Sequence, residues 1–176
     1  KKYNELTGSL EFEDTHLTEM LQLGRCRLDV DVRTLMMIDS LDMTETDRQI
    51  IVDNCKRCEE QQIVVTHGTD TMVETAEALA AAVPGKTIVL TGAMIPDAFV
   101  SSDGLFNLGS ALSFVQVLPP GVYIAMNGQV FPAARIRQAA PGARRSWNGS
   151  GWVAGSSLEV SSVSSTSAVR SDGLNT

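Results

Sequence analysis

The feature that most constrains the fold is a regular alternation of short apolar runs with longer amphipathic segments between Arg33 and Met126. The apolar runs are rich in β-branched residues and show no polar alternation, which is typical of strands buried on both faces of a parallel sheet. The intervening segments have the length and apolar periodicity of helices. We predict strands at 32–38, 62–66, 86–92 and 121–126, and helices at 44–61, 71–83 and 103–117.

This alternation predicts an α/β fold: a three-layer, doubly wound, mostly parallel sheet with right-handed crossovers. Ligands of such sheets bind beyond the carboxyl ends of the strands, where the polar turns of this sequence lie. Thr44 and Asp47 fit a capping box that begins the first helix, and Thr71 and Glu74 fit one for the second. The run 101–104 is explained as a loop that ends in the N-cap of the third helix.

The alternating pattern stops after Arg137. Residues 138–176 are rich in serine, contain no lysine and show neither helical nor strand periodicity. Such a composition does not supply enough apolar surface for a packed core. We therefore predict one α/β domain over 1–137 and a divergent, disordered tail over 138–176.

Composition and charge exclude several classes of protein. The chain of 176 residues has a net charge of −7, which argues against nucleic-acid partners because their binding surfaces are basic. The sequence contains no apolar run near the roughly 20 residues of a membrane helix, so we expect no membrane partner. We also predict no cofactor, because both G-x-G-x-x-G and a Walker lysine are absent.

The cysteines and histidines give no sign of a metal site. Cys26, Cys55 and Cys58 form no even-numbered disulfide framework, which favours a reducing, cytoplasmic location. Cys55 and Cys58 lie within a predicted helix without a second pair of ligands, so Cys55 is expected to pack in the core. His16 and His67 are the only histidines, and His67 is expected to form hydrogen bonds near its turn.

The turn after the strand 62–66 carries more polar groups than a helix start requires. The expected capping box accounts for Thr71, which leaves Thr69 and Asp70 on a turn hinged by Gly68. A hydroxyl beside a carboxylate could bind a cation, position a water molecule or hold an ammonium group. The alternative is that these residues only solvate the turn, because turns in α/β proteins are polar in any case.

Three segments, in this order, resemble the amino-terminal domain of the asparaginase/glutaminase family: VVTHGTDTMVETA, IVLTGAMIPDAFVSSDGLFNLGSAL and GVYIAMNGQVF. The resemblance spans roughly residues 3–137 and is greatest to the short, single-domain members. It implies a Rossmann-like α/β domain. It also implies hydrolysis of the side-chain amide of asparagine or glutamine through a threonine-bound acyl-enzyme, with release of ammonia.

The resemblance also implies roles for single residues. Thr69 matches the family's second catalytic threonine, and Asp70 matches the carboxylate that pairs with the α-ammonium group of the substrate. Ser40 matches the residue that binds the α-carboxylate, with Leu41 beside it where many relatives carry glutamine. Ala93 falls where a backbone carbonyl meets the substrate amide. All these residues lie at predicted strand ends.

Further matches and departures bear on activity. Gly68 belongs to the substrate-binding turn, and Tyr3 corresponds to a catalytic tyrosine of the family's mobile loop. The nucleophilic threonine of the family stands in a G-G-T turn, which the 176 residues do not contain. The catalytic lysine should follow FPAARIR, where this sequence has Gln138, and glutamine cannot act as a base.

The leading hypothesis is therefore an asparaginase-type amidohydrolase by descent, in a copy that is itself inactive. A noncatalytic amino-acid-binding domain and a nonfunctional fragment are the alternatives. The expected partners are a small amino-acid amide and a second copy of the chain in a homodimer, as in other members of the family.

Overall fold

The structure is a computed structural model that describes the backbone of residues 2–4, 9–11, 145–147 and 152–154, and the backbone and side chains of 16–95 and 102–134. Its elements, in chain order, are β1 (Lys2–Asn4), β2 (Ser9–Glu11), α1 (Leu17–Leu23), α2 (Glu45–Arg57), β3 (Gln62–Thr66), α3 (Met72–Ala82), β4 (Thr87–Thr91), α4 (Gly104–Val117), β5 (Gly121–Met126), β6 (Gln129–Pro132), β7 (Arg145–Trp147) and β8 (Trp152–Ala154).

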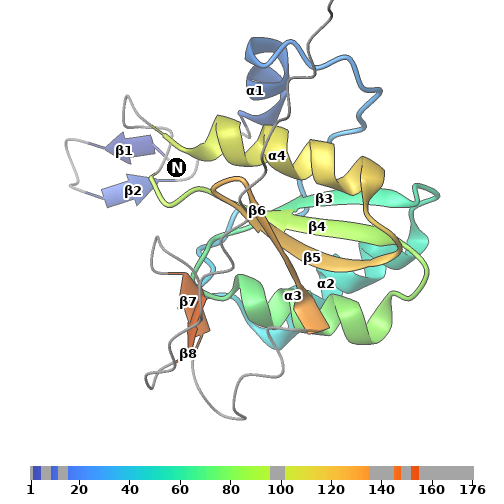
Figure 1. Cartoon of the computed structure of the whole chain (residues 1–176). Helices are drawn as coiled ribbons and strands as arrows, with labels where there is room; N and C mark the ends of the chain where they lie inside the picture. The colour runs from blue at the N-terminus through green and yellow to red at the C-terminus, as the bar shows by residue number, and fades with distance from the viewer. Residues whose placement is uncertain are drawn as a thin grey trace, which may run out of the picture.

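The main sheet has the strand order β3-β4-β5-β6 (Figure 1). β3, β4 and β5 are parallel, with Val64 opposite Val89 and Val89 opposite Tyr123. β6 is antiparallel to β5, and Ile124 lies opposite Phe131. The predicted α/β fold with a mostly parallel sheet is thus confirmed.

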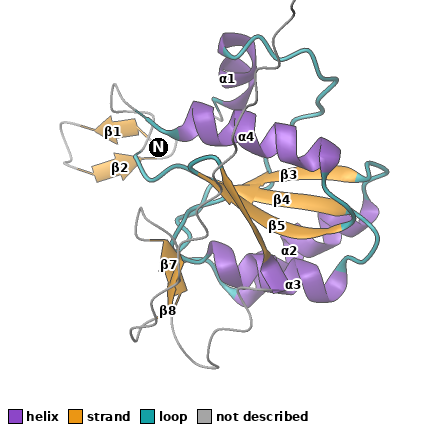
Figure 2. Cartoon of the chain, viewed as in Figure 1, coloured by secondary structure: helices purple, strands orange, loops and turns teal. Residues whose placement is uncertain are grey.

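Helices cover both faces of this sheet and form the outer layers (Figure 2). Side chains along β4 alternate between the two layers. Ile88 and Leu90 pack in a core shared with α2 and α3, while Val89 packs in a second core with Ala111 and Val115 of α4. β4 is therefore buried on both faces, which explains why its sequence is apolar without interruption.

The elements that the local pattern specifies strongly are confirmed. α2 begins with the predicted capping box, in which Thr44 Oγ1 accepts from the Asp47 N–H and Asp47 Oδ2 accepts from the Thr44 N–H at 2.8 Å. The helix ends at Arg57, four residues before the predicted end at 61. The predicted strands at 62–66, 86–92 and 121–126 and the helices at 71–83 and 103–117 correspond to β3, β4, β5, α3 and α4.

The predicted strand at 32–38 is wrong. These residues are described, but they form no strand and pair with no other strand of the described chain. A strand is stable only within a hydrogen-bonded ladder, which a local apolar pattern cannot supply. Met36 packs against the core, whereas Leu35 and Met37 are exposed.

The sequence pattern did not predict α1 or β6. α1 has only seven residues and none of them is fully buried, so its apolar face of Leu17, Met20 and Leu21 is too short to be a strong signal. β6 returns from β5 through Asn127 and Gly128, both of which have positive φ. An Asn-Gly pair between two apolar runs is a strong hairpin signal, and it was present in the sequence.

The tail is described only in part. β7 and β8 pair antiparallel, with Trp147 opposite Trp152, and the rest of 138–176 lies outside the described residues. The domain boundary at 137 and the disordered tail therefore stay predictions. Within the described part of the chain, no helix is long and apolar enough to cross a membrane.

Candidate active site

The candidate site lies where the carboxyl ends of β3 and β4 meet. The His67 N–H donates to the Thr91 carbonyl at 2.8 Å, which joins the turn after β3 to the end of β4. Gly92 packs on the same turn so closely that a Cβ at Gly92 would lie 2.3 Å from the His67 oxygen. The turn 67–71 and Ala93 are therefore held together at the edge of the sheet where a doubly wound fold binds its ligands.

The loop that carries Ser40 packs against this turn. The Thr71 hydroxyl donates to the Ser40 carbonyl at 2.7 Å. A Cβ at Gly68 would lie 2.4 Å from Ser40 Oγ and 2.7 Å from Ser40 Cβ. Only glycine therefore permits this approach, and two predicted site residues, Ser40 and Gly68, lie in direct contact.

The hydroxyl of Ser40 is the unusual group of the site. Ser40 is 3% exposed, and its Oγ is buried without a hydrogen-bond partner in the part of the chain that the structure describes. An unsatisfied buried polar group costs about 1–3 kcal/mol, so its presence in a native protein calls for an explanation. A ligand that accepts a hydrogen bond from Ser40 would supply one.

The predicted capping box of Thr71 and Glu74 is wrong. Thr71 is the N-cap residue of α3, but its side chain makes no capping hydrogen bond. The reason is a competing tertiary contact, since the hydroxyl donates to the Ser40 carbonyl instead. Thr71 therefore connects the turn to the Ser40 loop and does not stabilise the helix start.

The other predicted residues are placed around this contact. Thr69 is partly exposed and Asp70 is exposed, and neither side chain has a hydrogen bond within residues 16–95 and 102–134. Ala93 is partly buried beside the turn. Leu41 follows Ser40 with 66% of its surface exposed. A hydroxyl and a carboxylate are thus available to a ligand at the turn.

Two residues of the sequence hypothesis cannot be placed at the site. Tyr3 lies in β1, where only the backbone is described. Gln138, at the position expected for the lysine, lies outside the described residues.

His67 forms hydrogen bonds within its turn and to α3, and the predicted hydrogen bonding near the turn is thus confirmed. Its Nδ1 donates to the Gly68 carbonyl at 2.7 Å, and Nε2 accepts from the Thr75 hydroxyl at 2.8 Å. Burial lowers the pKa of His67 below its ordinary value of 6.5. The imidazole is therefore neutral at pH 7, and it fixes the position of Gly68 through α3.

Sequence reasoning missed Asn107, which links the carboxyl ends of β4 and β5 to the start of α4. Its side chain is fully buried, and Nδ2 donates to the Gly92 carbonyl at 2.9 Å and to Asp103 Oδ2 at 2.8 Å. Its Oδ1 accepts from the Asn127 N–H at 2.8 Å, in the turn after β5. The available signal was an amide side chain on the apolar face of a helix, where an unpaired polar group is costly.

Asp103 also differs from its predicted role. It precedes α4 as the N-cap residue, but its side chain makes no capping hydrogen bond. Its carboxylate instead accepts from the backbone of Met94 at 3.2 Å and of Ile95 at 3.0 Å. The residue therefore holds the segment after β4.

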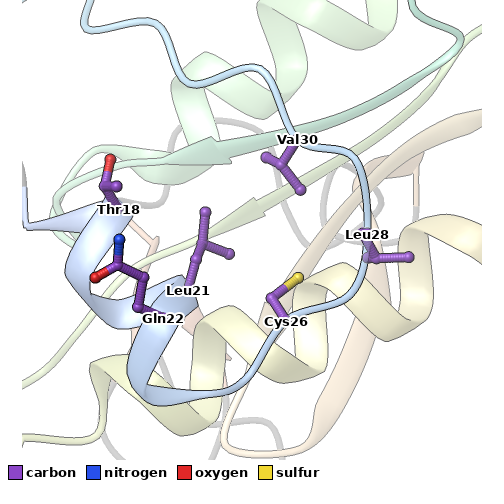
Figure 3. Close-up of a pocket in the computed structure, with 6 residues that line it drawn as sticks. All are labelled: Thr18, Leu21, Gln22, Cys26, Leu28 and Val30. Carbon is purple, nitrogen blue, oxygen red and sulfur yellow. The ribbon is translucent and has the colours of Figure 1, made fainter.

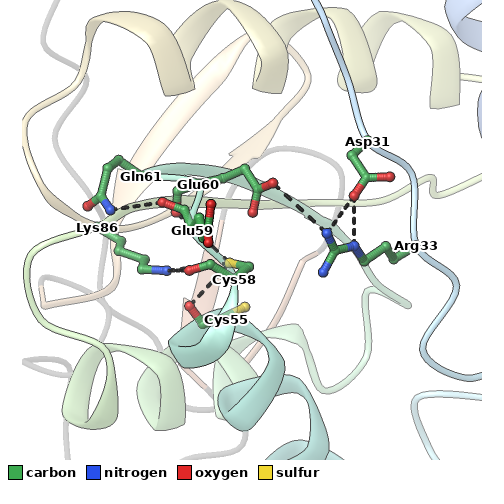
Figure 4. Close-up of polar contacts among 8 residues, drawn as sticks. All are labelled: Asp31, Arg33, Cys55, Cys58, Glu59, Glu60, Gln61 and Lys86. Atoms are coloured by element: carbon green, nitrogen blue, oxygen red, sulfur yellow. Dashed lines mark hydrogen bonds and ion pairs between the residues drawn. The ribbon is translucent and has the colours of Figure 1, made fainter.

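The cysteine pair lies near the amino ends of β3 and β4 (Figure 4). Cys55 is buried in the core, and burial raises the pKa of its thiol to about 11. Cys58 Sγ donates to the Cys55 carbonyl at 3.4 Å, and Lys86 Nζ donates to the Cys58 carbonyl. The packing role of Cys55 is confirmed, and the described residues contain no cluster of side chains that could hold a metal ion.

A pocket lies between α1 and the chain that follows it (Figure 3). It has no ionisable acid or base other than a thiol, and none of its side chains comes from the turns described above. Its lining residues are Thr18, Leu21, Gln22, Cys26, Leu28 and Val30.

Known proteins resemble this chain in sequence. Residues 1–150 match the family model described as Asparaginase, N-terminal. L-asparaginase of Thermococcus kodakarensis is 40% identical over 76 residues, which are 42% of this chain and 23% of that protein. L-asparaginase 1 of Escherichia coli strain K12 is 36% identical over 108 residues, which are 58% of this chain and 32% of that protein.

The fold has a solved counterpart as well. The crystal structure of a probable cytoplasmic L-asparaginase from Campylobacter jejuni superposes with a TM-score of 0.62 and 29% sequence identity. The match covers 67% of this chain and 40% of that one, so the chain spans less than half the length of each of these proteins. The family model, by contrast, covers most of the chain, and the chain therefore belongs to the asparaginase N-terminal domain family.

Proposed function

We propose that this chain supplies the amino-acid-binding part of an asparaginase-type amidohydrolase, which converts the side-chain amide of asparagine or glutamine to the acid and ammonia. The observation that carries the proposal is the buried, unpartnered hydroxyl of Ser40 against the turn that bears Thr69 and Asp70. The membership of the chain in the family supports the same reaction.

The proposed site recognises both charged ends of an α-amino acid. Ser40 Oγ donates a hydrogen bond to the α-carboxylate, which satisfies its unused capacity. Asp70 pairs with the α-ammonium group through a charge-assisted hydrogen bond, which is about twice as strong as a neutral one. The carbonyl of Ala93 accepts from the side-chain amide. These contacts leave the amide carbon beside Thr69.

In the proposed reaction, a threonine hydroxyl attacks the amide carbon, the carbon–nitrogen bond breaks, and the nitrogen takes up the hydroxyl proton and leaves as ammonia. Water then hydrolyses the acyl-enzyme to the acid and restores the hydroxyl. Thr69 orients the attacking group and the later water. The G-G-T threonine and the lysine of the family are not among the 176 residues, so we expect this chain by itself to bind the substrate without cleaving it.

One observation favours a second candidate, a noncatalytic amino-acid-binding domain. Gln138 stands where the family has its lysine, whereas Ser40, Thr69 and Asp70 are all retained. The two candidates share the binding site and differ only in turnover.

The binding site is tested by calorimetric titration of the 176-residue chain with three ligands. L-asparagine carries both charged ends, succinamic acid lacks the α-ammonium group and 3-aminopropanamide lacks the α-carboxylate. We expect L-asparagine to bind most tightly. Asp70→Ala should weaken the binding of L-asparagine by roughly 1.5–3 kcal/mol, the range for a hydrogen bond to a charged group. It should leave the binding of succinamic acid unchanged, because that ligand has no ammonium group to pair.

Ser40→Ala provides the matched test of the other end. It should weaken L-asparagine and succinamic acid but not 3-aminopropanamide, which has no carboxylate. Failure of the folded chain to bind L-asparagine would refute the proposal. So would an equal effect of each substitution on all three ligands.

A further inference from the structure

We propose that Asp103 and Asn107 are positioning residues that make the site select a side-chain amide over a side-chain carboxylate. They would do so by fixing the backbone of Ala93. The inference rests on the proposed function, in which the Ala93 carbonyl accepts a hydrogen bond from the substrate amide.

Asp103 holds the backbone that follows Ala93. Its Oδ2 accepts from the Met94 N–H at 3.2 Å, and its Oδ1 accepts from the Ile95 N–H at 3.0 Å. Ser102 completes this attachment, since its hydroxyl donates to the Ile95 carbonyl at 2.8 Å. Two consecutive peptide groups are therefore tied to the start of α4.

Asn107 holds the backbone that precedes Ala93. Its Nδ2 donates to the Gly92 carbonyl at 2.9 Å and also to Asp103 Oδ2 at 2.8 Å. Its Oδ1 accepts from the Asn127 N–H at 2.8 Å. The amide is fully buried and uses both donors and its acceptor, so it has a single satisfied orientation.

Ala93 is thus held on both sides while its own carbonyl stays available. No hydrogen bond within residues 16–95 and 102–134 uses that carbonyl oxygen. Gly92 also packs on the backbone of His67, which places Ala93 beside the turn that carries Thr69 and Asp70. A fixed acceptor therefore adjoins the proposed binding site.

A fixed carbonyl oxygen discriminates between the two side chains because it can only accept a hydrogen bond. The amide of asparagine donates to it. The carboxylate of aspartate carries no proton at neutral pH, so two oxygens would face each other and bind weakly. A mobile backbone could turn the carbonyl away and relieve this repulsion. The same rigidity would favour release of the acid product.

The test compares the dissociation constants of L-asparagine and L-aspartate for the full chain and two variants. Asp103→Asn exchanges one accepting oxygen for a donor and loosens the backbone after Ala93. We expect the preference for asparagine over aspartate to fall about 3- to 10-fold, which is the worth of one hydrogen bond. Asp53→Asn is the control, because it makes the same charge change on α2, where Asp53 accepts from Gln49. It should leave the preference unchanged.

Three outcomes of this comparison would overturn the inference. An equal loss of affinity for both ligands in Asp103→Asn would show that the residue is only structural and would overturn it. An unchanged preference would also overturn it. If the wild-type chain binds neither ligand, the proposed function itself fails, and the inference fails with it.

A second measurement does not depend on the folding of a variant. Amide hydrogen exchange in the wild-type chain should show protection at Met94 and Ile95, whose N–H groups donate to Asp103. Exchange of both amides at the rate of an unstructured peptide would overturn the inference.

Discussion

At the scale of single residues, the site depends on a contact between Ser40 and a glycine. Gly68 lies so near to Ser40 that any Cβ would overlap its hydroxyl. The conformation of the Gly68 backbone is not the reason, since its φ is not positive. The constraint is space, and it links the Ser40 loop to the residues that we propose bind the substrate.

Gly68→Ala should therefore destabilise the chain by about 1–3 kcal/mol, as overpacking does, and weaken the binding of L-asparagine. Gly109→Ala in α4 is the matched control, because a Cβ there would meet nothing within 4 Å. That change should raise the free energy of unfolding by about 0.5–1 kcal/mol. Urea denaturation of both variants checks this, and equal effects of the two substitutions would contradict it.

The buried imidazole predicts how stability depends on pH. Burial lowers the pKa of His67 in the folded chain below 6.5, its ordinary value. Between that value and the folded pKa, the unfolded chain binds a proton that the folded chain does not. The contribution of the neutral His67 to the free energy of unfolding should thus be complete above pH 6.5. It should decrease as the pH falls from 6.5 towards the pKa of His67 in the folded chain.

Denaturation of variants between about pH 5 and 7 isolates the contribution of His67. His67→Gln should remove the decrease, whatever its effect on the absolute stability. His16→Gln should retain it, because the side chain of His16 is 41% exposed and pairs only with Glu19 among its described neighbours. Identical slopes for wild type and His67→Gln would show that the buried imidazole does not titrate in this way.

At the scale of elements, α2 and α3 each have a threonine as the N-cap residue, but the two hydroxyls bind different partners. Thr44 forms a capping box with Asp47 and stabilises α2. Thr71 stands at the same place before α3, yet its hydroxyl binds the Ser40 carbonyl. One threonine stabilises its helix, whereas the other stabilises the site.

Thr44→Ala should lower the free energy of unfolding by about 0.5–2 kcal/mol without changing the affinity for L-asparagine. Thr71→Ala should weaken that affinity, because the Ser40 loop loses its hydrogen bond to the turn. Denaturation and calorimetry on the same two variants provide both quantities. A loss of affinity in Thr44→Ala and not in Thr71→Ala would show that the two threonines have the opposite roles.

These elements also show which parts of the fold are visible in the sequence. β4 was predicted from its uninterrupted apolar run, and α2 from its apolar periodicity and its capping box, because these signals are local in the sequence. Residues 32–38 have the same apolar character but lack a neighbouring strand in the described chain, and local pattern does not report a neighbour. The hydrogen bond of the Thr71 hydroxyl was likewise determined by Ser40, a partner 31 positions away in the sequence.

For the candidate site too, the sequence indicated single residues but not the contacts between distant ones. Ser40, Thr69 and Asp70 were proposed through a resemblance to a known family, and their roles stay predictions. The interactions of Asn107 were not found, because they join Gly92 and Asp103, between β4 and α4, to Asn127 in the turn after β5. A buried amide on an apolar helix face indicated that partners were needed, but not which ones.

At the scale of the whole molecule, the groups that we propose recognise the amino acid come from separate parts of the chain. Thr69, Asp70 and Ala93 lie at the carboxyl ends of β3 and β4, and Ser40 lies in the loop before α2 that packs on the same turn. The nucleophilic threonine and the lysine of the family have no counterpart in the 176 residues. Homodimer formation stays a prediction, as does the preference between asparagine and glutamine.

Ammonia release by a chimaera is the decisive test of the roles that we propose for these residues. The chimaera joins residues 1–137 to the G-G-T strand and the lysine-bearing segment of a full-length asparaginase. We expect it to release ammonia from L-asparagine and to lose this activity in Thr69→Ala, while residues 1–176 alone release none above background. Clear amidase activity of the 176-residue chain, or full activity of the Thr69→Ala chimaera, would contradict the proposed division of roles.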